Sequence, residues 1–379
     1  MFAPLAKFAD WSAIQIVWGR RLNSLLKGRD HSPSPRLEEA LEFLKGPDFI
    51  PTESQPARLE FSSAKSGLHF QFPTPRPSKF PENNVVYGRL YPGAEQWQGR
   101  PTIILLHGAG GDPDYHFGFP RIARRCNRAG FNAVILMSPF QFQRRPRQLE
   151  RMIHWPDWML LAEITFAQAV AEIRAMIGWL LKEGCPAVAL WGNSYGGQLA
   201  GITVCRDARL AAVVLTAPGV NLNVSLSVAK QMVWPRVRAE LWSQQPAREA
   251  LNFTALNLTT TQPRIPKDNI LLIEAIHDLF VERRFLEELW QAWEQPDIWR
   301  LPHGHASKSL VPGLTGRVLR WLSPRLDAPA ARNNRMPLPI RRVEQTGDSR
   351  CTQSKIERQP RLPPVADPER WLAPLVAKQ

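Results

Sequence analysis

The segment around Ser194 combines residue types and a spacing that suit a serine nucleophile. Gly192 and Gly196 flank Ser194 two positions away on either side, which is the G-x-S-x-G spacing of a nucleophile elbow. In such an elbow the serine lies in a sharp turn between a strand and a helix, and neighbours without Cβ atoms let the two elements approach. The apolar run 187–191 predicts a buried strand before the turn, and the small residues after it predict a helix. We therefore predict that Ser194 is a nucleophile.

A serine nucleophile also needs a base that takes its proton and a carboxylate that orients the base. Asp278 directly follows the predicted strand 268–276, and ends of parallel strands bring side chains together at one edge of a sheet. Glu274, within that strand, and Glu282, at the start of the next helix, are the alternatives. The position after the strand favours Asp278 as the orienting carboxylate.

Two histidines follow the last predicted strand, 298–301, and either one is a candidate base. His303 and His305 share the small neighbour Gly304, which suits a ring that moves between the serine and the leaving group. His305 precedes the final helix, so its side chain can face back over the edge of the sheet. We favour His305 as the base, with His303 as the alternative.

The oxyanion of an acyl transfer needs backbone N–H donors. One is expected from Tyr195, directly after the nucleophile, and one from the glycine-rich loop 107–111. We assign the second to Ala109, with Gly108 and Gly110 as alternatives. The loop has neither the Lys-Ser/Thr ending of a P-loop nor the G-x-G-x-x-G spacing, so no nucleotide site is predicted.

Strand and helix patterns alternate from about residue 102 to 322, which predicts an α/β fold with a mostly parallel central sheet and helices on both faces. Alternating runs between 58 and 92 predict an antiparallel edge. The predicted strands of the parallel part are 102–106, 131–137, 187–191, 210–216, 268–276 and 298–301, and the predicted helices are 163–181, 285–293 and 308–322.

Composition changes along the chain predict three parts. Residues 1–57 form an N-terminal helical extension, 58–323 a catalytic domain with a helical lid insertion at about 220–267, and 324–379 a mostly disordered tail rich in Pro and Arg. The first helix has apolar residues near helical spacing, among them Leu5, Phe8 and Trp11. We expect this stripe to pack onto the catalytic domain; an interfacial membrane anchor is the alternative.

The motifs His107-Gly-Ala-Gly-Gly111, Gly192-Asn-Ser-Tyr-Gly196, Asp278 and Gly304-His305, in this order, resemble those of the α/β-hydrolase superfamily. More narrowly, the chain resembles the abhydrolase domain-containing type, over about residues 85–322. The resemblance implies an eight-stranded, mostly parallel sheet and a Ser194–Asp278–His305 triad, with no metal or organic cofactor. Superfamily motifs do not specify the substrate.

These residues predict a serine hydrolase that cleaves a carboxylic ester, a small-molecule or lipid substrate, through an acyl-enzyme. Apolar residues of the 220–267 segment favour a lipid or other long-chain acyl ester. The alternatives are a serine peptidase or amidase on the same triad and a non-catalytic hydrolase-fold binding protein. No paired-glutamate motif for an α-amine is apparent, and the intact Ser-Asp-His set speaks against the binding protein.

The chain of 379 residues carries a net charge of +14 from arginines spread along its length. Such basicity favours anionic surfaces, so peripheral contact with an anionic membrane is one expectation, whereas no nucleic-acid-binding motif accompanies the charge. No apolar run reaches the roughly 18 residues of a membrane-spanning helix. The scattered cysteines form no disulfide or metal pattern, which predicts a cytoplasmic protein. The sequence carries no signal for an oligomeric state. The cysteines are Cys126, Cys185, Cys205 and Cys351.

Overall fold

The structure is a computed structural model, and it describes residues 3–19, 55–63, 67–78, 80–109, 114–146, 155–243, 245 and 256–327. Of residues 155–164 only the backbone is described. The later part of the predicted N-terminal extension, Cys351 and the predicted tail from residue 328 onward lie outside the described residues.

A sheet of nine strands, in the order β1-β2-β3-β5-β4-β6-β7-β8-β9, forms the centre of the described part of the chain. In this spatial order, the strands β1, β2, β3 and β5 pair antiparallel with their neighbours. From β5 onward, through β4, β6, β7 and β8 to β9, neighbouring strands pair parallel. The predicted mostly parallel sheet with an antiparallel edge is therefore confirmed, with nine strands in place of the eight that the resemblance implied. The strands are β1 (Glu60–Ser63), β2 (Leu68–Pro73), β3 (Val85–Tyr91), β4 (Thr102–Leu106), β5 (Asn132–Leu136), β6 (Val188–Asn193), β7 (Ala212–Thr216), β8 (Ile270–Ala275) and β9 (Asp297–Leu301).

The central strands are mostly apolar because both of their faces are covered. Every residue of β4, β5, β7 and β8 is buried. By contrast, β9 lies at the edge of the sheet and buries only its last residue, Leu301. Continuous apolar runs in the sequence thus correspond to strands that pack against helices on both sides.

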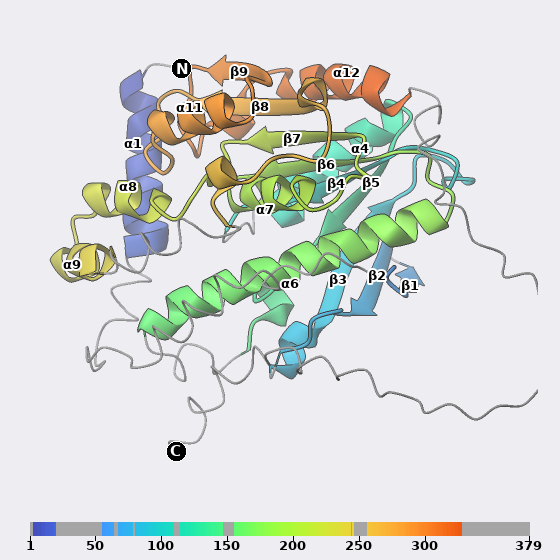
Figure 1. The fold of residues 1–379 in the computed structure, drawn as a ribbon, viewed down its shortest axis with the longest axis horizontal. Helices are drawn as coiled ribbons and strands as arrows, with labels where there is room; N and C mark the ends of the chain where they lie inside the picture. Colours follow the sequence, from blue (N-terminus) through green and yellow to red (C-terminus); the bar gives the residue numbers. More distant parts are fainter. Residues whose placement is uncertain are drawn as a thin grey trace, which may run out of the picture.

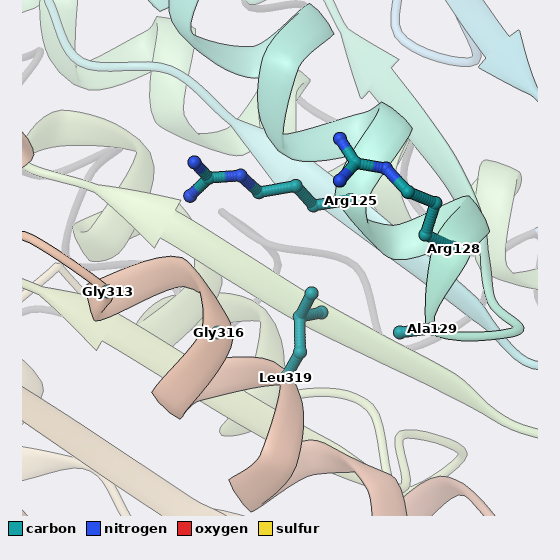
Figure 2. Close-up of a pocket in the computed structure, with 6 residues that line it drawn as sticks. All are labelled: Arg125, Arg128, Ala129, Gly313, Gly316 and Leu319. Carbon is teal, nitrogen blue, oxygen red and sulfur yellow. The ribbon is translucent and has the colours of Figure 1, made fainter.

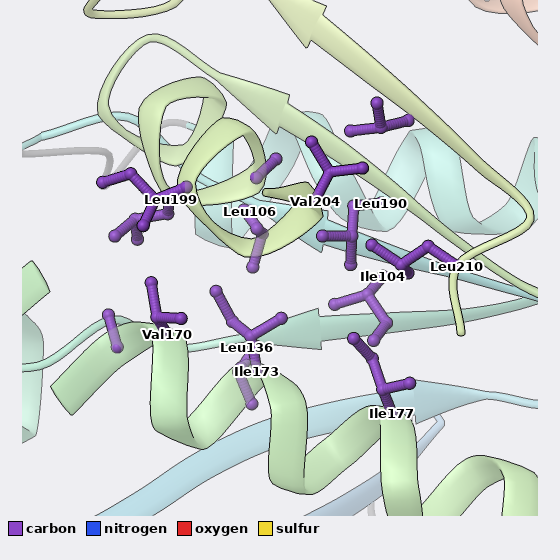
Figure 3. Close-up of a cluster of buried hydrophobic side chains, with 14 of the residues drawn as sticks. Ile104, Leu106, Leu136, Val170, Ile173, Ile177, Leu190, Leu199, Val204 and Leu210 are labelled. Atoms are coloured by element: carbon purple, nitrogen blue, oxygen red, sulfur yellow. The ribbon is translucent and has the colours of Figure 1, made fainter. Parts of the chain in front are cut away.

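Helices cover the two faces of the sheet in separate sets (Figure 1). On one face, side chains of α6 and α7 meet alternate residues of the strands (Figure 3). On the other face, α4 and α12 pack against the remaining strand residues. The helices are α4 (Phe119–Arg128), α6 (Trp155–Lys182), α7 (Tyr195–Val204), α11 (Arg283–Ala292), on the same face as α6, and α12 (Leu314–Leu326).

The predicted helix 163–181 begins earlier than expected, at Trp155, and ends at Lys182. The predicted final helix 308–322 divides into a short turn and α12, because Gly313 takes a left-handed conformation with φ of 70° between them. Short 3₁₀ and π segments complete the described chain: η1 (Ile14–Gly19), η3 (Pro81–Asn84), η4 (Asp114–Gly118), η5 (Phe142–Arg144), η6 (Leu258–Thr260), η7 (Lys267–Asn269) and η8 (Lys308–Leu310).

Residues 220–267 contain the helices α8 (Val224–Gln231) and α9 (Pro235–Ser243). Met232 and Leu241 of this segment are buried in a small cluster with Ile14 of η1. The cluster also contacts Phe280, which follows β8. Part of the apolar character of this segment therefore serves its own packing.

The N-terminal helix α1 (Ala3–Ala13) turns a different face to the protein than the sequence suggested. Leu5, Phe8 and Trp11 are 60%, 64% and 38% exposed, whereas Ala6 and Asp10 are fully buried. The expectation that the apolar stripe packs onto the catalytic domain is therefore wrong for Leu5, Phe8 and Trp11, whereas Ile14, farther along the same stripe, is fully buried. In Figure 1, α1 lies beside α8, at the end of the sheet toward which the arrows of β7 and β9 point. In the described ranges, no helix is both long enough and apolar enough to cross a membrane.

Candidate active site

Ser194 lies in the turn between β6 and α7 with φ of 55°, a left-handed conformation that a residue other than glycine rarely adopts. Its amide donates to the carbonyl of Thr216 on the neighbouring strand at 2.8 Å. A Cβ atom on Gly192 would collide with the backbone of Gly196, and one on Gly196 would collide with the backbone of Leu106. The two glycines are therefore required for this strand and helix to cross so closely.

The structure brings Ser194, His305 and Asp278 into one chain of contacts. The hydroxyl of Ser194 lies 2.8 Å from Nε2 of His305, and Nδ1 of His305 lies 2.6 Å from Oδ2 of Asp278. The second oxygen of Asp278 accepts the backbone N–H groups of Phe280 and Val281 at 2.7 and 2.8 Å. Because an ionised carboxylate only accepts, Nδ1 of His305 carries the donated proton and Nε2 faces the serine as an acceptor.

The alternatives for the acid and the base have other contacts. Glu274 pairs with Arg283 and Arg300 at 3.2 and 2.8 Å, and Glu282 pairs with Lys230 at 2.7 Å. His303 accepts the backbone N–H of His277 through its carbonyl oxygen, and burial lowers the pKa of its ring. It is His305 that faces Ser194.

The predicted oxyanion donors Tyr195 and Ala109 belong to the two segments that lie next to Ser194. Tyr195 is the first residue of α7, directly after Ser194. Ala109 follows Gly108, where a Cβ atom would lie 3.3 Å from Cβ of Ser194, so the loop passes directly beside the serine. Gly110 lies outside the described residues.

His107 and Asp114 fix the surroundings of that loop. The buried ring of His107 accepts the N–H of Ser138 at Nε2, at 3.2 Å, and contacts the carbonyl of Gly108 at Nδ1, at 2.8 Å. Asp114 accepts the side-chain amide of Asn193, the residue before the serine, at 2.6 Å. His107 thus shapes the loop through both nitrogens of its ring. Asp114 is a neighbour of the serine that sequence reasoning missed.

Asp10 of α1 is a site residue that sequence reasoning missed. Its Oδ2 accepts the backbone N–H of Leu279 at 3.0 Å and that of His305 at 2.7 Å, and its Oδ1 accepts the N–H of Ala306 at 2.8 Å. Burial raises the pKa of Asp10, and the nearby Asp278 acts in the same direction, against the lowering effect of the three N–H donors. The sequence around Asp10 carries no signal for these contacts, because all three partners follow residue 278.

Lys308 is a second buried charge beside the site and was also missed. Its ammonium donates to the carbonyl oxygen of His305 at 2.6 Å. Burial lowers the pKa of Lys308, while the carboxylates of Asp278, Asp114 and Asp10 oppose that shift. His305 is therefore held at its N–H by a carboxylate and at its C=O by an ammonium group.

Phe280 covers one side of the His305 ring, with ring centroids 4.6 Å apart and planes inclined by 32°. It also packs against the cluster that joins η1 to α8 and α9. The imidazole therefore has an apolar wall that connects it to the 220–267 segment.

A separate hollow of about 410 Å³ lies between α4 and α12 (Figure 2). It is lined by Gly313, Gly316 and Leu319 on one side and by Ala129 and the exposed Arg125 and Arg128 on the other. These residues belong to different elements from those that carry Ser194, Asp278 and His305. Over the described ranges, no three His, Cys, Asp or Glu side chains are grouped so that they could hold a metal ion.

The fold is shared with solved structures of low sequence identity. An acetyl xylan esterase from Paenibacillus sp. R4 aligns over 79% of this chain and 98% of its own, with a TM-score of 0.51 and 13% identity. Acetyl xylan esterase 1 from Thermoanaerobacterium sp. aligns over 81% and 98%, with a TM-score of 0.51 and 16% identity. At these identities the likeness establishes the fold alone.

Sequence comparison places the chain in a family. An uncharacterised protein of Mycobacterium tuberculosis is 25% identical over 235 residues, which are 59% of this chain and 53% of that protein. The chain thus spans about half the length of this curated relative. The model of the alpha/beta hydrolase family matches residues 103–371, which include Ser194, Asp278 and His305. The chain belongs to the alpha/beta hydrolase family.

Proposed function

We propose that this protein is a serine hydrolase that cleaves a carboxylic ester through an acyl-enzyme. The observation that carries the proposal is the contact chain from Ser194 Oγ to His305 Nε2, at 2.8 Å, and from His305 Nδ1 to Asp278 Oδ2, at 2.6 Å. The left-handed conformation of Ser194 supports it, because strained backbone concentrates at functional positions. Ser194 is the nucleophile, His305 the base and Asp278 the orienting carboxylate.

In the acylation step, Nε2 of His305 takes the hydroxyl proton of Ser194 as Oγ attacks the ester carbonyl carbon. The carbonyl oxygen becomes an oxyanion, which the backbone N–H groups of Tyr195 and Ala109 stabilise. The imidazolium then gives its proton to the alkoxide leaving group as the C–O bond breaks. Asp278 stabilises the imidazolium and keeps the ring in its tautomer throughout.

In the deacylation step, the same His305 nitrogen takes a proton from water, whose oxygen attacks the acyl carbon. The tetrahedral intermediate collapses, Ser194 leaves with the proton that the imidazolium returns, and the carboxylic acid is released. No cofactor enters either step.

We assign residues 1–57 to the N-terminal extension and 58–326 to the catalytic domain. The second boundary lies three residues beyond the predicted one, because α12 ends at Leu326 and this residue is buried against the sheet.

For the substrate, we propose a long-chain acyl or lipid ester taken from an anionic membrane surface. The exposed apolar side chains of α1 and η1, Leu5, Phe8 and Ile16, support this. Ile14 of η1 packs with Met232 and Leu241, so this segment lies against α8 and α9. Further exposed apolar residues are Val233, between α8 and α9, and Trp242 of α9. Exposed cations lie in α1 and α9, namely Lys7, Arg236 and Arg238.

An apolar surface with a basic rim matches an anionic phospholipid interface. The segment 220–267 is the proposed lid of the site, because it borders Phe280 and thereby the His305 ring. Steep loss of vesicle binding with rising salt is the expected behaviour.

A fluorophosphonate probe tests the proposed chemistry, because it reacts with an activated serine. We expect the wild-type protein to be labelled and Ser194→Ala to remain unlabelled. p-Nitrophenyl esters from acetate to palmitate then measure the preference for chain length. A well-folded wild-type protein that is not labelled would overturn the proposal, and faster hydrolysis of anilides than of esters would favour an amidase.

A further inference from the structure

Asp10 connects the two loops that carry the proposed base and its carboxylate. Leu279, in the loop after β8, is the chain neighbour of Asp278, and its amide donates to Oδ2 of Asp10 at 3.0 Å. The amides of His305 and Ala306, in the loop after β9, donate to the same carboxylate at 2.7 and 2.8 Å. One side chain of the N-terminal helix therefore holds both loops by their backbones.

The fit between α1 and the second loop is close. A Cβ atom at Gly304 would lie 2.7 Å from Oδ1 of Asp10 and 2.8 Å from the carbonyl oxygen of Ala6. Only a residue without a side chain lets the helix reach this position. Gly304 therefore serves the approach of α1, in addition to the freedom that the neighbouring histidine needs.

The chemical nature of Asp10 goes beyond what docking of a helix requires. An apolar side chain in a fully buried position would pack without the cost of desolvating a carboxylate. The three N–H donors offset that cost, and charge-assisted hydrogen bonds fix geometry more strongly than neutral ones. The charged groups that interact electrostatically with Asp10 are the carboxylate of Asp278 and the ammonium group of Lys308.

We propose that Asp10 is a positioning residue of the hydrolase, which holds the His305 and Asp278 loops at the separation that the Ser194–His305 contact needs. The proposal rests on the proposed function, since it assigns Asp10 a part in the same reaction. Asp10 acts through the backbone of His305 and does not itself touch the reacting atoms. The N-terminal helix, which lies before the region matched by the family model, thereby contributes to the site.

The test compares Asp10→Ala and Asp10→Asn with Gln15→Ala in the full-length protein. Gln15 belongs to the same N-terminal segment and is also buried, but its contacts are with the α8–α9 connection and not with the catalytic loops. Misplacing a catalytic group by about 1 Å costs on the order of 100-fold in rate. We expect kcat of Asp10→Ala to fall about 100-fold with KM changed less than about two-fold.

Asp10→Asn is expected to lie between the wild type and Asp10→Ala, because an amide offers one acceptor oxygen in place of two. Gln15→Ala is expected to keep the wild-type kcat. Wild-type kcat in Asp10→Ala, or an equal fall of kcat in Gln15→Ala, would overturn the proposal. If Asp10→Ala does not fold, Asp10→Asn gives the same comparison with the smallest change of shape.

A spectroscopic readout separates this proposal from the proposed function. The proton shared by His305 Nδ1 and Asp278 gives a downfield proton resonance that does not depend on turnover. We expect the resonance in the wild type and its shift or loss in Asp10→Ala and Asp10→Asn, but not in Gln15→Ala. If the fluorophosphonate probe does not label the wild type but the resonance still changes in the Asp10 variants, the hydrolase activity is refuted. Asp10 would then still position His305 and Asp278. A labelled wild type with an unchanged resonance in Asp10→Ala would refute the positioning role alone.

Discussion

The buried ammonium group of Lys308 lies 2.6 Å from the carbonyl oxygen of His305, three residues before it in the chain. The same peptide segment is held on its other side by Asp10, which accepts the amide of His305. The two contacts fix both polar groups of the His305 backbone. Its imidazole is thus supported by a framework of opposite charges.

The pH dependence of stability should report Lys308. Burial lowers the pKa of Lys308 in the folded state below its ordinary value of 10.5, so the unfolded chain binds more protons between the two values. Stability then rises with pH across that window, as the folded state sheds the proton of a poorly solvated amine. We expect the free energy of unfolding of Lys308→Met to rise less with pH than that of the wild type, in chemical denaturation measured from pH 7 to 10.5. The same slope in both proteins would contradict a lowered pKa.

The proposed triad predicts the largest losses of activity. Ser194→Ala and His305→Ala should each lower kcat by a factor on the order of 10⁶. Asp278→Asn should lower kcat by a factor on the order of 10⁴. Hydrolysis of a p-nitrophenyl ester measures kcat of each variant, and circular dichroism checks that the variant is folded. His303→Ala is the matched control, because it lies beside the site without contacting Ser194 as His305 does. An inactive His303→Ala beside an active His305→Ala would reverse the assignment of the base.

Gly304→Ala should separate α1 from the site. The added Cβ atom would meet Asp10 and the backbone of Ala6, so the helix must move or the loop must distort. Overpacking of this kind costs about 1–3 kcal/mol of the free energy of unfolding. We expect a lower kcat together with a lower urea midpoint. Gly316→Ala in α12 is the control, since its nearest contact is the end of Arg320 at 3.7 Å and alanine favours a helix.

The exposed face of α1 predicts how the protein meets a membrane. Replacing Leu5 and Phe8 together by Gln removes apolar surface that is 60% and 64% exposed. We expect weaker cosedimentation with vesicles that contain anionic phospholipid, and unchanged hydrolysis of soluble p-nitrophenyl acetate. Unchanged vesicle binding of the double variant would contradict the proposed surface. Loss of acetate hydrolysis would show that the two side chains support the site instead.

The buried pair of Arg144 and Glu172 predicts a stability effect remote from the serine. Arg144 donates to both oxygens of Glu172, at 2.6 and 2.8 Å, and both side chains are fully buried. Removal of one partner leaves the other charge buried without its counterion, which costs about 3–5 kcal/mol. Glu172→Leu should therefore lower the free energy of unfolding by that amount in urea denaturation. The exposed Glu288→Leu in α11 should change it far less.

Several strands could be predicted from local sequence because every position along them is covered by helices in the same way. The strand 102–106 was predicted with the bounds that the structure gives β4, since a strand covered on both faces has an almost continuous apolar run. Ser194, Asp278 and His305 were predicted from their places after strands, and the structure brings them into contact. In these cases chain order and sheet geometry carry the information.

Other features depend on contacts between distant segments and could not be predicted in this way. The periodicity of Leu5 and Phe8 indicates an apolar face of the helix but not whether the protein covers it. Asp10 has no local signal for its function, because all three of its backbone partners follow residue 278. A buried carboxylate is understood only together with the amides that it binds.

The contact of Asp10 with Ala306 has a consequence for the order of events during biosynthesis. It joins residues separated by 296 positions, so α1 can bind its partners only after nearly all of the described residues have been synthesised. Closing so long a loop is entropically unfavourable until most of the sheet has formed. A partly synthesised or partly folded chain therefore has its serine elbow without a fixed base. The proposed hydrolase activity is therefore expected late in folding, once α1 has bound the loops after β8 and β9.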